Sequence, residues 1–207
     1  MKERNVITGQ KAFVDYFSAL CSSYAYQNES TIREILKGRN SPMQFNNFFQ
    51  DKSTSTEAFI AINHDESEVI LAFRGSQELQ DFKIDAQFWM VPFTGGQGKV
   101  SSGFLKAWGN VKNQILLRLG QIITDPSKYT LIITGHSLGG ALATIASVDI
   151  FNYFKNKYQK VPGQFIMVNF GAPMVGNKDF VNMYNNLTSS GLSSRLSLIL
   201  MIQSKTW

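Results

Sequence analysis

Residues 129–146 read YTLIITGHSLGGALATIA. The first six are apolar or β-branched with no regular polar alternation, which is typical of a strand covered on both faces. The last six are rich in Ala and predict the start of a buried helix. Between them, Gly135, Ser137 and Gly139 form the pattern Gly-x-Ser-x-Gly. This pattern predicts a nucleophile elbow, in which a serine sits on a sharp turn between a strand and a helix.

The surroundings of Ser137 strengthen a motif that is weak by itself. Glycines two residues to either side suit a place where strand and helix approach too closely for a Cβ atom. A helix that begins behind the serine offers backbone N–H groups and a positive dipole end to a developing oxyanion. We therefore predict Ser137 as a nucleophile and the N–H of Leu138 as the first oxyanion donor.

Hydrophobic periodicity over the rest of the chain predicts an alternation of strands and helices. The predicted elements are helices at 11–26, 31–36 and 104–119, hairpin strands at 58–63 and 68–74, and a buried strand at 165–170. Residues 40–56 are rich in Asn, Ser, Thr and Gln and are predicted as a surface connection. The order implies right-handed crossovers and an α/β fold with a mostly parallel sheet flanked by helices. We expect one domain at 11–207 after a flexible N-terminus at 1–10.

Composition favours a globular protein without a nucleic-acid partner. The chain has 207 residues, of which 43% are hydrophobic and 17% charged, and its net charge of +5 is scattered rather than gathered in a basic run. It has no apolar run of about 20 residues and no segment like a signal peptide, so we expect a soluble chain without a transmembrane segment. Its compartment stays open. The single cysteine, Cys21, is predicted to be a small buried hydrophobe.

Four segments resemble the class 3 (fungal-lipase-like) lipases of the α/β-hydrolase superfamily. Gly135-His136-Ser137-Leu138-Gly139-Gly140 matches the family signature around the serine. Phe73-Arg74-Gly75-Ser76 is similar to its Phe-Arg-Gly-Ser/Thr segment. Residues 170–177 are similar to Phe-Gly-Ser/Ala-Pro-Arg-Val-Gly-Asn, with Met174 in place of Arg. The segment VSSGF from Val100 matches in part, since a serine stands where the family has His.

The resemblance implies hydrolysis of acylglycerols or related lipid esters, with Ser76 completing the oxyanion hole and no metal or organic cofactor. It also implies a short lid helix at residues 77–93, which would open at a lipid interface. The apolar side chains expected to contact acyl chains or the interface there are Phe82, Ile84, Phe88, Trp89, Met90, Val91 and Phe93. Ordinary core packing of these side chains is the alternative.

The Asp and His of a catalytic triad are not identifiable. In this fold the order is Ser, then Asp or Glu, then His. The two histidines are His64, in a predicted turn, and His136, whose side chain should point away from the serine hydroxyl. The acids after Ser137 are Asp149, about three helical turns away, and Asp179, which suits the start of a helix.

We therefore expect a C-terminally truncated domain that departs from the family pattern near Arg195 and is inactive or weakly active. The rival hypothesis is a non-catalytic lipid-binding or regulatory pseudoenzyme. A third, hydrolysis of thioesters or peptides, is permitted by the elbow but disfavoured by the other family segments.

Overall fold

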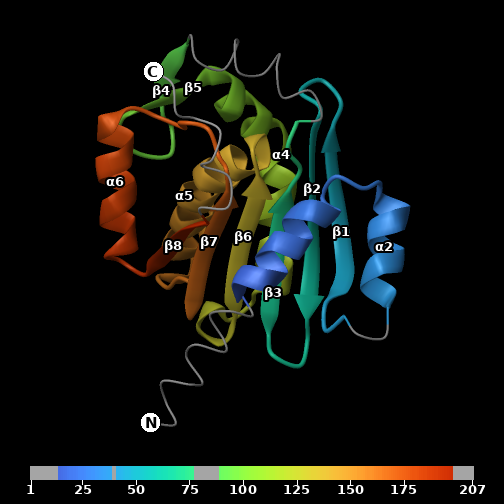
Figure 1. Cartoon of the computed structure of the whole chain (residues 1–207). Helices are drawn as coiled ribbons and strands as arrows, with labels where there is room; N and C mark the ends of the chain where they lie inside the picture. The colour runs from blue at the N-terminus through green and yellow to red at the C-terminus, as the bar shows by residue number, and fades with distance from the viewer. Residues whose placement is uncertain (1–13, 39–40, 77–88, 198–207) are drawn as a thin grey trace.

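A six-stranded sheet forms the centre of the molecule. The computed structural model describes residues 14–38, 41–76 and 89–197 (Figure 1). The strands are, in spatial order, β1 (Gln44–Asp51), β2 (Thr56–Asn63), β3 (Glu68–Phe73), β6 (Thr130–His136), β7 (Gln164–Phe170) and β8 (Leu192–Ser197). β1, β2 and β3 pair antiparallel, whereas β3, β6, β7 and β8 run parallel. The predicted α/β fold with a mostly parallel sheet is confirmed.

Helices cover both faces of this sheet. They are a helix at residues 14–24, α2 (Glu29–Lys37), α4 (Ser102–Ile122), α5 (Leu138–Tyr158) and α6 (Lys178–Thr188). The first two lie on one face, and α4 and α5 pack on the other (Figure 1). Side chains along each strand alternate between the two resulting cores, so that Ile132 faces the helix at 14–24 while Leu131 and Ile133 face α4 and α5.

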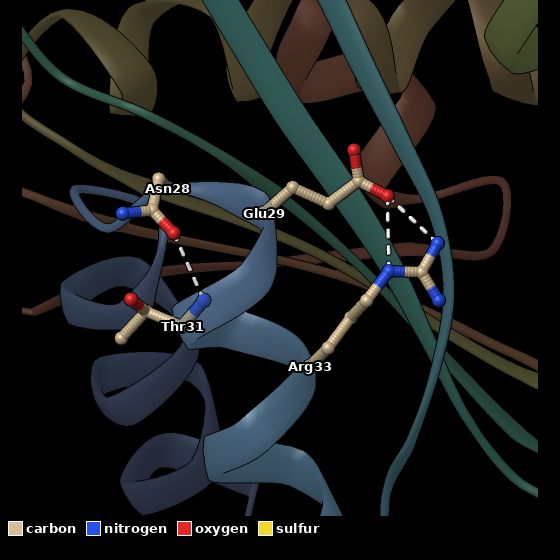
Figure 2. Close-up of polar contacts among 4 residues, drawn as sticks. All are labelled: Asn28, Glu29, Thr31 and Arg33. Atoms are coloured by element: carbon tan, nitrogen blue, oxygen red, sulfur yellow. Dashed lines mark hydrogen bonds and ion pairs between the residues drawn. The ribbon is translucent and has the colours of Figure 1, made fainter.

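Local contacts start α2 and dock it against β1. Asn28 caps α2, since its Oδ1 accepts a hydrogen bond from the N–H of Thr31 at 2.9 Å (Figure 2). Arg33 forms an i,i+4 ion pair with Glu29 at 2.7 Å, which Figure 2 also shows. The Arg33 guanidinium also lies 3.9 Å above the ring of Phe45 in β1. These contacts fix α2 against the edge of the sheet.

The prediction of a surface connection at 40–56 is wrong, because residues 44–51 form β1. Phe49 is buried in the core beneath α4 and α5, and Phe45 and Phe48 pack partly against the other core. A register shift between Phe45 and Asn47 marks a bulge in the strand. Strand preference depends on burial and cross-strand packing, and β1 is the outer strand of the described sheet. The Asn and Gln residues of this segment made it resemble a loop, but its phenylalanines anchor it as a strand.

Asp51 closes the turn between β1 and β2. Its Oδ2 accepts hydrogen bonds from Ser53 Oγ at 2.8 Å and from both the N–H and Oγ1 of Thr54, at 2.8 and 2.6 Å. Asn110 Nδ2 of α4 donates to the same oxygen at 3.0 Å. These bonds hold the pKa of Asp51 well below its usual range, and those from the side chains of Thr54 and Asn110 have the largest effect. The folded state therefore stabilises the charged form of the Asp51 carboxylate.

A lowered pKa makes Asp51 a source of acid sensitivity. Its contribution to stability is present above the unfolded pKa of about 3.9 and is lost as the pH falls below that value towards the folded pKa. We expect Asp51→Asn to lower the melting temperature at neutral pH and to flatten the loss of stability below about pH 4. Circular-dichroism melts across this range measure it, with Asp65→Asn in the next turn as the charge control. Equal slopes for wild type and Asp51→Asn would contradict the assignment.

Candidate active site

Ser137 occupies a strained turn between β6 and α5. Its backbone angles are φ 54° and ψ −122°, in a region that residues with a Cβ atom rarely adopt. Its N–H donates to the carbonyl of Phe170 at the end of β7 at 2.8 Å. Its own carbonyl accepts from the N–H groups of Gly140 and Ala141, at 3.0 and 3.2 Å. The neighbouring strand and the helix thus hold the turn in place.

The glycines around Ser137 permit close backbone packing. A Cβ atom on Gly135 would overlap the backbone of Gly139, and a Cβ on Gly139 would overlap the carbonyl of Phe73 in β3. At Gly140 an added Cβ would lie 3.0 Å from the Cβ of Ala172. The start of α5 therefore rests directly on the ends of β3 and β6, as the elbow pattern predicts.

The first turn of α5 is suited to an anion. Leu138 is its first residue, and the first N–H groups of a helix have no partner within the helix. This first turn contains no acidic residue, so no carboxylate offsets the positive end of the helix dipole. Leu138 itself is buried, while Ser137 is half-buried. Negative charge that develops beside Ser137 would therefore meet backbone donors.

The segment that carries Ser76 leaves the sheet beside this turn. β3 and β6 are parallel, and Phe73 pairs with Gly135, so residues 74–76 emerge at the same edge as the elbow. A Cβ atom on Gly75 would lie 2.6 Å from the carbonyl oxygen of His136 and would overlap the hydroxyl of Tyr26. Ser76, the predicted second oxyanion residue, is half-buried and directly follows this contact.

Arg74 anchors the same segment from below. Its N–H donates to the carbonyl of Glu57 at 2.9 Å, and its guanidinium forms an ion pair with the Glu57 carboxylate at 2.5 Å. Both side chains are largely buried, which strengthens the interaction relative to an exposed pair. The path of residues 74–76 is thus set by β2 as well as by β3.

The two histidines lie in different environments, one beside Tyr26 and the other in an exposed turn. His136 Nδ1 lies 2.8 Å from the hydroxyl of Tyr26, and burial lowers the pKa of the imidazole. His64 is exposed in the turn between β2 and β3. That turn adjoins the amino end of β6, since Glu68 pairs with Thr130, whereas Ser137 follows its carboxyl end. The imidazole of His64 is therefore separated from Ser137 by the length of the strand.

The two acids that follow Ser137 have structural partners. Asp149 is only 6% exposed, and its Oδ2 accepts from Trp108 Nε1 at 2.7 Å and from Lys112 Nζ at 2.8 Å. Asp179 lies in the first turn of α6, as predicted, behind the N-cap Asn177. Both acids that follow Ser137 in the sequence thus have structural roles in the described part of the chain.

A profile of the family described as "Lipase (class 3)" matches residues 70–197. This range holds the elbow, the Ser76 segment and the strands that carry them. The chain belongs to the class 3 lipase family. The match confirms the resemblance that the four sequence segments indicated.

Individual class 3 lipases align with part of this chain and with less of themselves. A lipase of Rhizomucor miehei is 30% identical over 145 residues, which cover 68% of this chain and 37% of that protein. The "Secreted mono- and diacylglycerol lipase A" of Penicillium cyclopium is 36% identical over 104 residues, or 49% of this chain and 34% of the relative. The chain thus spans little more than a third of the length of these curated relatives.

Solved lipase structures share the fold. Lipase II from Rhizopus niveus superposes with a TM-score of 0.74 at 21% identity, over 90% of this chain and 72% of that one. The triacylglyceride lipase of Rhizomucor miehei gives a TM-score of 0.74 at 22% identity, over 91% and 70%.

The lid expected of a class 3 lipase falls largely outside the described residues, and Phe82 and Phe88 lie there. Trp89 is described and is 74% exposed. The expectation of a lid up to residue 93 is wrong, because Met90–Pro92 form strand β4, which pairs with β5 (Lys99–Ser101). Val91 is half-buried opposite Val100 in this ribbon. Phe93 is core, with its ring 5.4 Å from that of Phe180, so the packing alternative holds for it.

The segment at 170–177 ties this ribbon to the parallel sheet. Ser101, which stands where the family has His, is buried and donates its N–H to the carbonyl of Val175 at 3.1 Å. Asn177 Oδ1 accepts from the N–H of Lys99 at 2.9 Å while it caps α6. Met174, in place of the usual Arg, is 74% exposed. Of the two departures from the family pattern, Ser101 is thus packed in the interior and Met174 lies on the surface.

One residue at the site has no sequence signal. The sequence predicts Tyr26 only as the last residue of an amphipathic helix. Its hydroxyl nevertheless contacts His136 and occupies the place that a Cβ atom on Gly75 would fill. Tyr26 and His136 are 110 residues apart in sequence. Only the docking of the helix at 14–24 onto β6 brings them together.

In the described part of the chain, no three His, Cys, Asp or Glu side chains are grouped so that they could bind a metal ion. None of the helices in the described ranges combines the length and apolar character needed to cross a bilayer.

Proposed function

We propose that this chain is a lipase/esterase-type serine hydrolase acting on acylglycerols or related lipid esters, with Ser137 as its nucleophile. The observation that carries the proposal is the left-handed turn at Ser137, at the N-terminus of α5. Strain of this kind costs about 1–3 kcal/mol and persists only where the surroundings hold it. The substrate class follows from relatives named as lipases and as mono- and diacylglycerol lipases.

The proposed chemistry is acyl transfer through two steps. Ser137 Oγ attacks the ester carbonyl, and its proton leaves as the C–O bond to the alcohol breaks and the alcohol is protonated. Negative charge on the carbonyl oxygen is held by the N–H of Leu138 and by Ser76. Water then attacks the acyl-serine, which releases the fatty acid and restores the hydroxyl. No cofactor takes part in this scheme.

We expect the proton transfers in this scheme to lack an effective base among the described residues. His136 Nδ1 is engaged by Tyr26, and Asp149 is held by Trp108 and Lys112. A serine hydrolase without its triad partners keeps a residual acceleration of about 10³–10⁴ over water from the oxyanion hole and binding. We therefore expect weak turnover from this chain.

Exposed apolar side chains near β5 support peripheral contact with a lipid interface. Trp89 and Met174 are each 74% exposed. Their segments flank β5, because Ser102 N–H donates to the carbonyl of Trp89 at 2.9 Å and Ser101 N–H donates to Val175 at 3.1 Å. Large exposed apolar side chains on a surface favour an apolar partner. An interface of lipid esters is the partner that fits the proposed chemistry.

The same lack of a base favours a second candidate, a non-catalytic protein that binds lipid esters or fatty acids. Such a protein would retain the fold and the backbone donors at Leu138 without activating Ser137. The two candidates differ in the reactivity of one hydroxyl, which an electrophilic probe reports.

A fluorophosphonate probe tests the nucleophile. We expect slow labelling of the intact chain that is lost in Ser137→Ala, because the elbow and backbone donors assist attack even without a triad. Hydrolysis of 4-nitrophenyl butyrate should be weak for a serine hydrolase and should fall further in Ser137→Ala. Intact mass spectrometry and peptide mapping measure the label, and Ser76→Ala should slow labelling without abolishing it.

Each other outcome has a definite meaning. Labelling that persists in Ser137→Ala would refute Ser137 as the nucleophile. An absence of labelling, together with saturable binding of a fluorescent fatty acid, would favour the non-catalytic protein. Robust ester turnover abolished by Ser137→Ala would support the hydrolase and contradict the expected weakness.

A further inference from the structure

A row of polar side chains runs along the helix at residues 14–24 towards the elbow. Ser18, Ser22 and Tyr26 follow one another at intervals of four residues. Ser22 Oγ lies 2.8 Å from Thr134 Oγ1, which also donates to the carbonyl of Ser18 at 3.3 Å. The remainder of this interface is an apolar core. Polar contacts in such a setting specify a docking position rather than merely adding burial.

The last member of this row, Tyr26, contacts the elbow itself. Its hydroxyl is 2.8 Å from His136 Nδ1, and the two rings are tilted with their centroids 6.0 Å apart. His136 directly precedes Ser137 in the chain. Tyr26 lies just beyond the helix, where its N–H donates to the carbonyl of Ser23 at 3.2 Å.

The same hydroxyl also contacts the Ser76 segment. The site that a Cβ atom on Gly75 would fill is taken by the Tyr26 hydroxyl, with the carbonyl of His136 close by. One oxygen atom therefore packs against the residue before Ser76 and bonds the residue before Ser137.

Burial affects the protonation of both members of this pair. Burial raises the pKa of Tyr26, an effect partly opposed by Arg74, and burial lowers the pKa of His136. At neutral pH the phenol is therefore protonated and the imidazole is neutral. When the phenol donates to Nδ1, the imidazole proton resides on Nε2.

We propose that Tyr26 is a positioning residue, whose hydroxyl ties His136 to the Gly75 backbone and so sets the spacing between Ser76 and Ser137. The assignment rests on the proposed function, since it concerns the proposed oxyanion and nucleophile segments. Tyr26 is not a catalytic residue, because it acts through its neighbours. It also explains why residue 75 is glycine.

Local hydrogen exchange provides a test that needs no catalysis. In Tyr26→Phe we expect amides at 74–76 and 135–139 to exchange about fivefold faster, as loss of one net hydrogen bond implies. Exchange in β1 and α6 should stay as in the wild type. Tyr16→Phe is the matched control, since it removes an exposed hydroxyl from the same helix. It should leave both segments unchanged.

Nitrogen-15 NMR of the imidazoles adds a readout that general loosening would not move. In the wild type, His136 should show the Nε2–H tautomer, and Tyr26→Phe should shift it towards a mixture. His64, the other histidine and an exposed one, serves as the internal reference. If Tyr26→Phe does not fold, His136→Gln removes the same bond from the opposite side and should raise exchange at 74–76.

The outcomes separate this proposal from the proposed function. Unchanged exchange and an unchanged tautomer in Tyr26→Phe would overturn the positioning role, as would an equal rise in exchange over the whole chain. Failure of the probe to label Ser137 would instead reject the hydrolase while leaving these measurements valid. Where labelling does occur, Tyr26→Phe should slow it about five- to tenfold, the range set by one hydrogen bond.

Discussion

Gly139→Ala is expected to destabilise the protein by about 3 kcal/mol, at the upper end of the range for overpacked sites. The added Cβ would overlap the carbonyl of Phe73 and lie 2.9 Å from the carbonyl carbon of Arg74. These are backbone atoms at the end of a central strand, so they cannot turn aside as a flexible side chain would. The start of α5 must move instead, and we expect labelling of Ser137 to be lost with it.

Urea denaturation followed by circular dichroism measures the change, with Gly109→Ala as the control. Gly109 lies within α4, where an added Cβ would meet nothing within 4 Å. Alanine there should stabilise the protein by about 0.5–1 kcal/mol, because glycine is the poorer helix former. If both variants shift stability in the same direction and by similar amounts, the close packing of the elbow on β3 is not as described.

Asp149→Ala is expected to cost about 3 kcal/mol, since it breaks a buried ion pair and leaves a buried donor without its partner. Trp108 is fully buried, and its Nε1–H donates to the lost carboxylate at 2.7 Å. Lys112 is 31% exposed, so its ammonium group can turn towards water and limit the loss. Most of the penalty should therefore come from the indole N–H.

Two further variants test this explanation. Asp149→Asn keeps an acceptor for Trp108 but lacks the charge that pairs with Lys112, so its effect should be intermediate. Asp179→Ala removes an exposed acid from the first turn of α6 and should cost no more than about 0.3–1 kcal/mol. Denaturation midpoints give these values. A variant Asp149→Ala that unfolds like the wild type yet no longer reacts with the probe would point to a catalytic role instead.

The central strands could be predicted because burial on both faces removes polar residues from them. In β6, Leu131, Ile132 and Ile133 face opposite cores, so the run is continuously apolar. β1 could not be predicted from composition, since its amides resemble those of a loop. Its pairing with β2 and the burial of Phe49 decide its structure, and both depend on residues distant in sequence.

At the candidate site, local chemistry was predictable and long-range contacts were not. Gly135, Ser137 and Gly139 indicate the turn because the whole pattern lies within five residues, and the atoms that exclude a Cβ at Gly135 belong to Gly139 and Gly140. The rise of a helix also placed Asp149 away from the elbow, but it gave no indication of the partners Trp108 and Lys112. Those two residues contact Asp149 from another helix, just as Tyr26 contacts His136 from another element. These contacts form only when the helices pack on the sheet.

The pairing of Phe73 with Gly135 has a consequence for how such a molecule can diverge. Neighbouring strands lie about 4.8 Å apart wherever a ladder is intact. The distance between the two segments where they leave this edge is therefore set by the hydrogen bonds of the sheet, and the proposed Tyr26 contact acts beyond that point, between Gly75 and His136. Insertions and exchanges in the loops that follow can alter which molecules are admitted while the separation of the reacting groups stays constant.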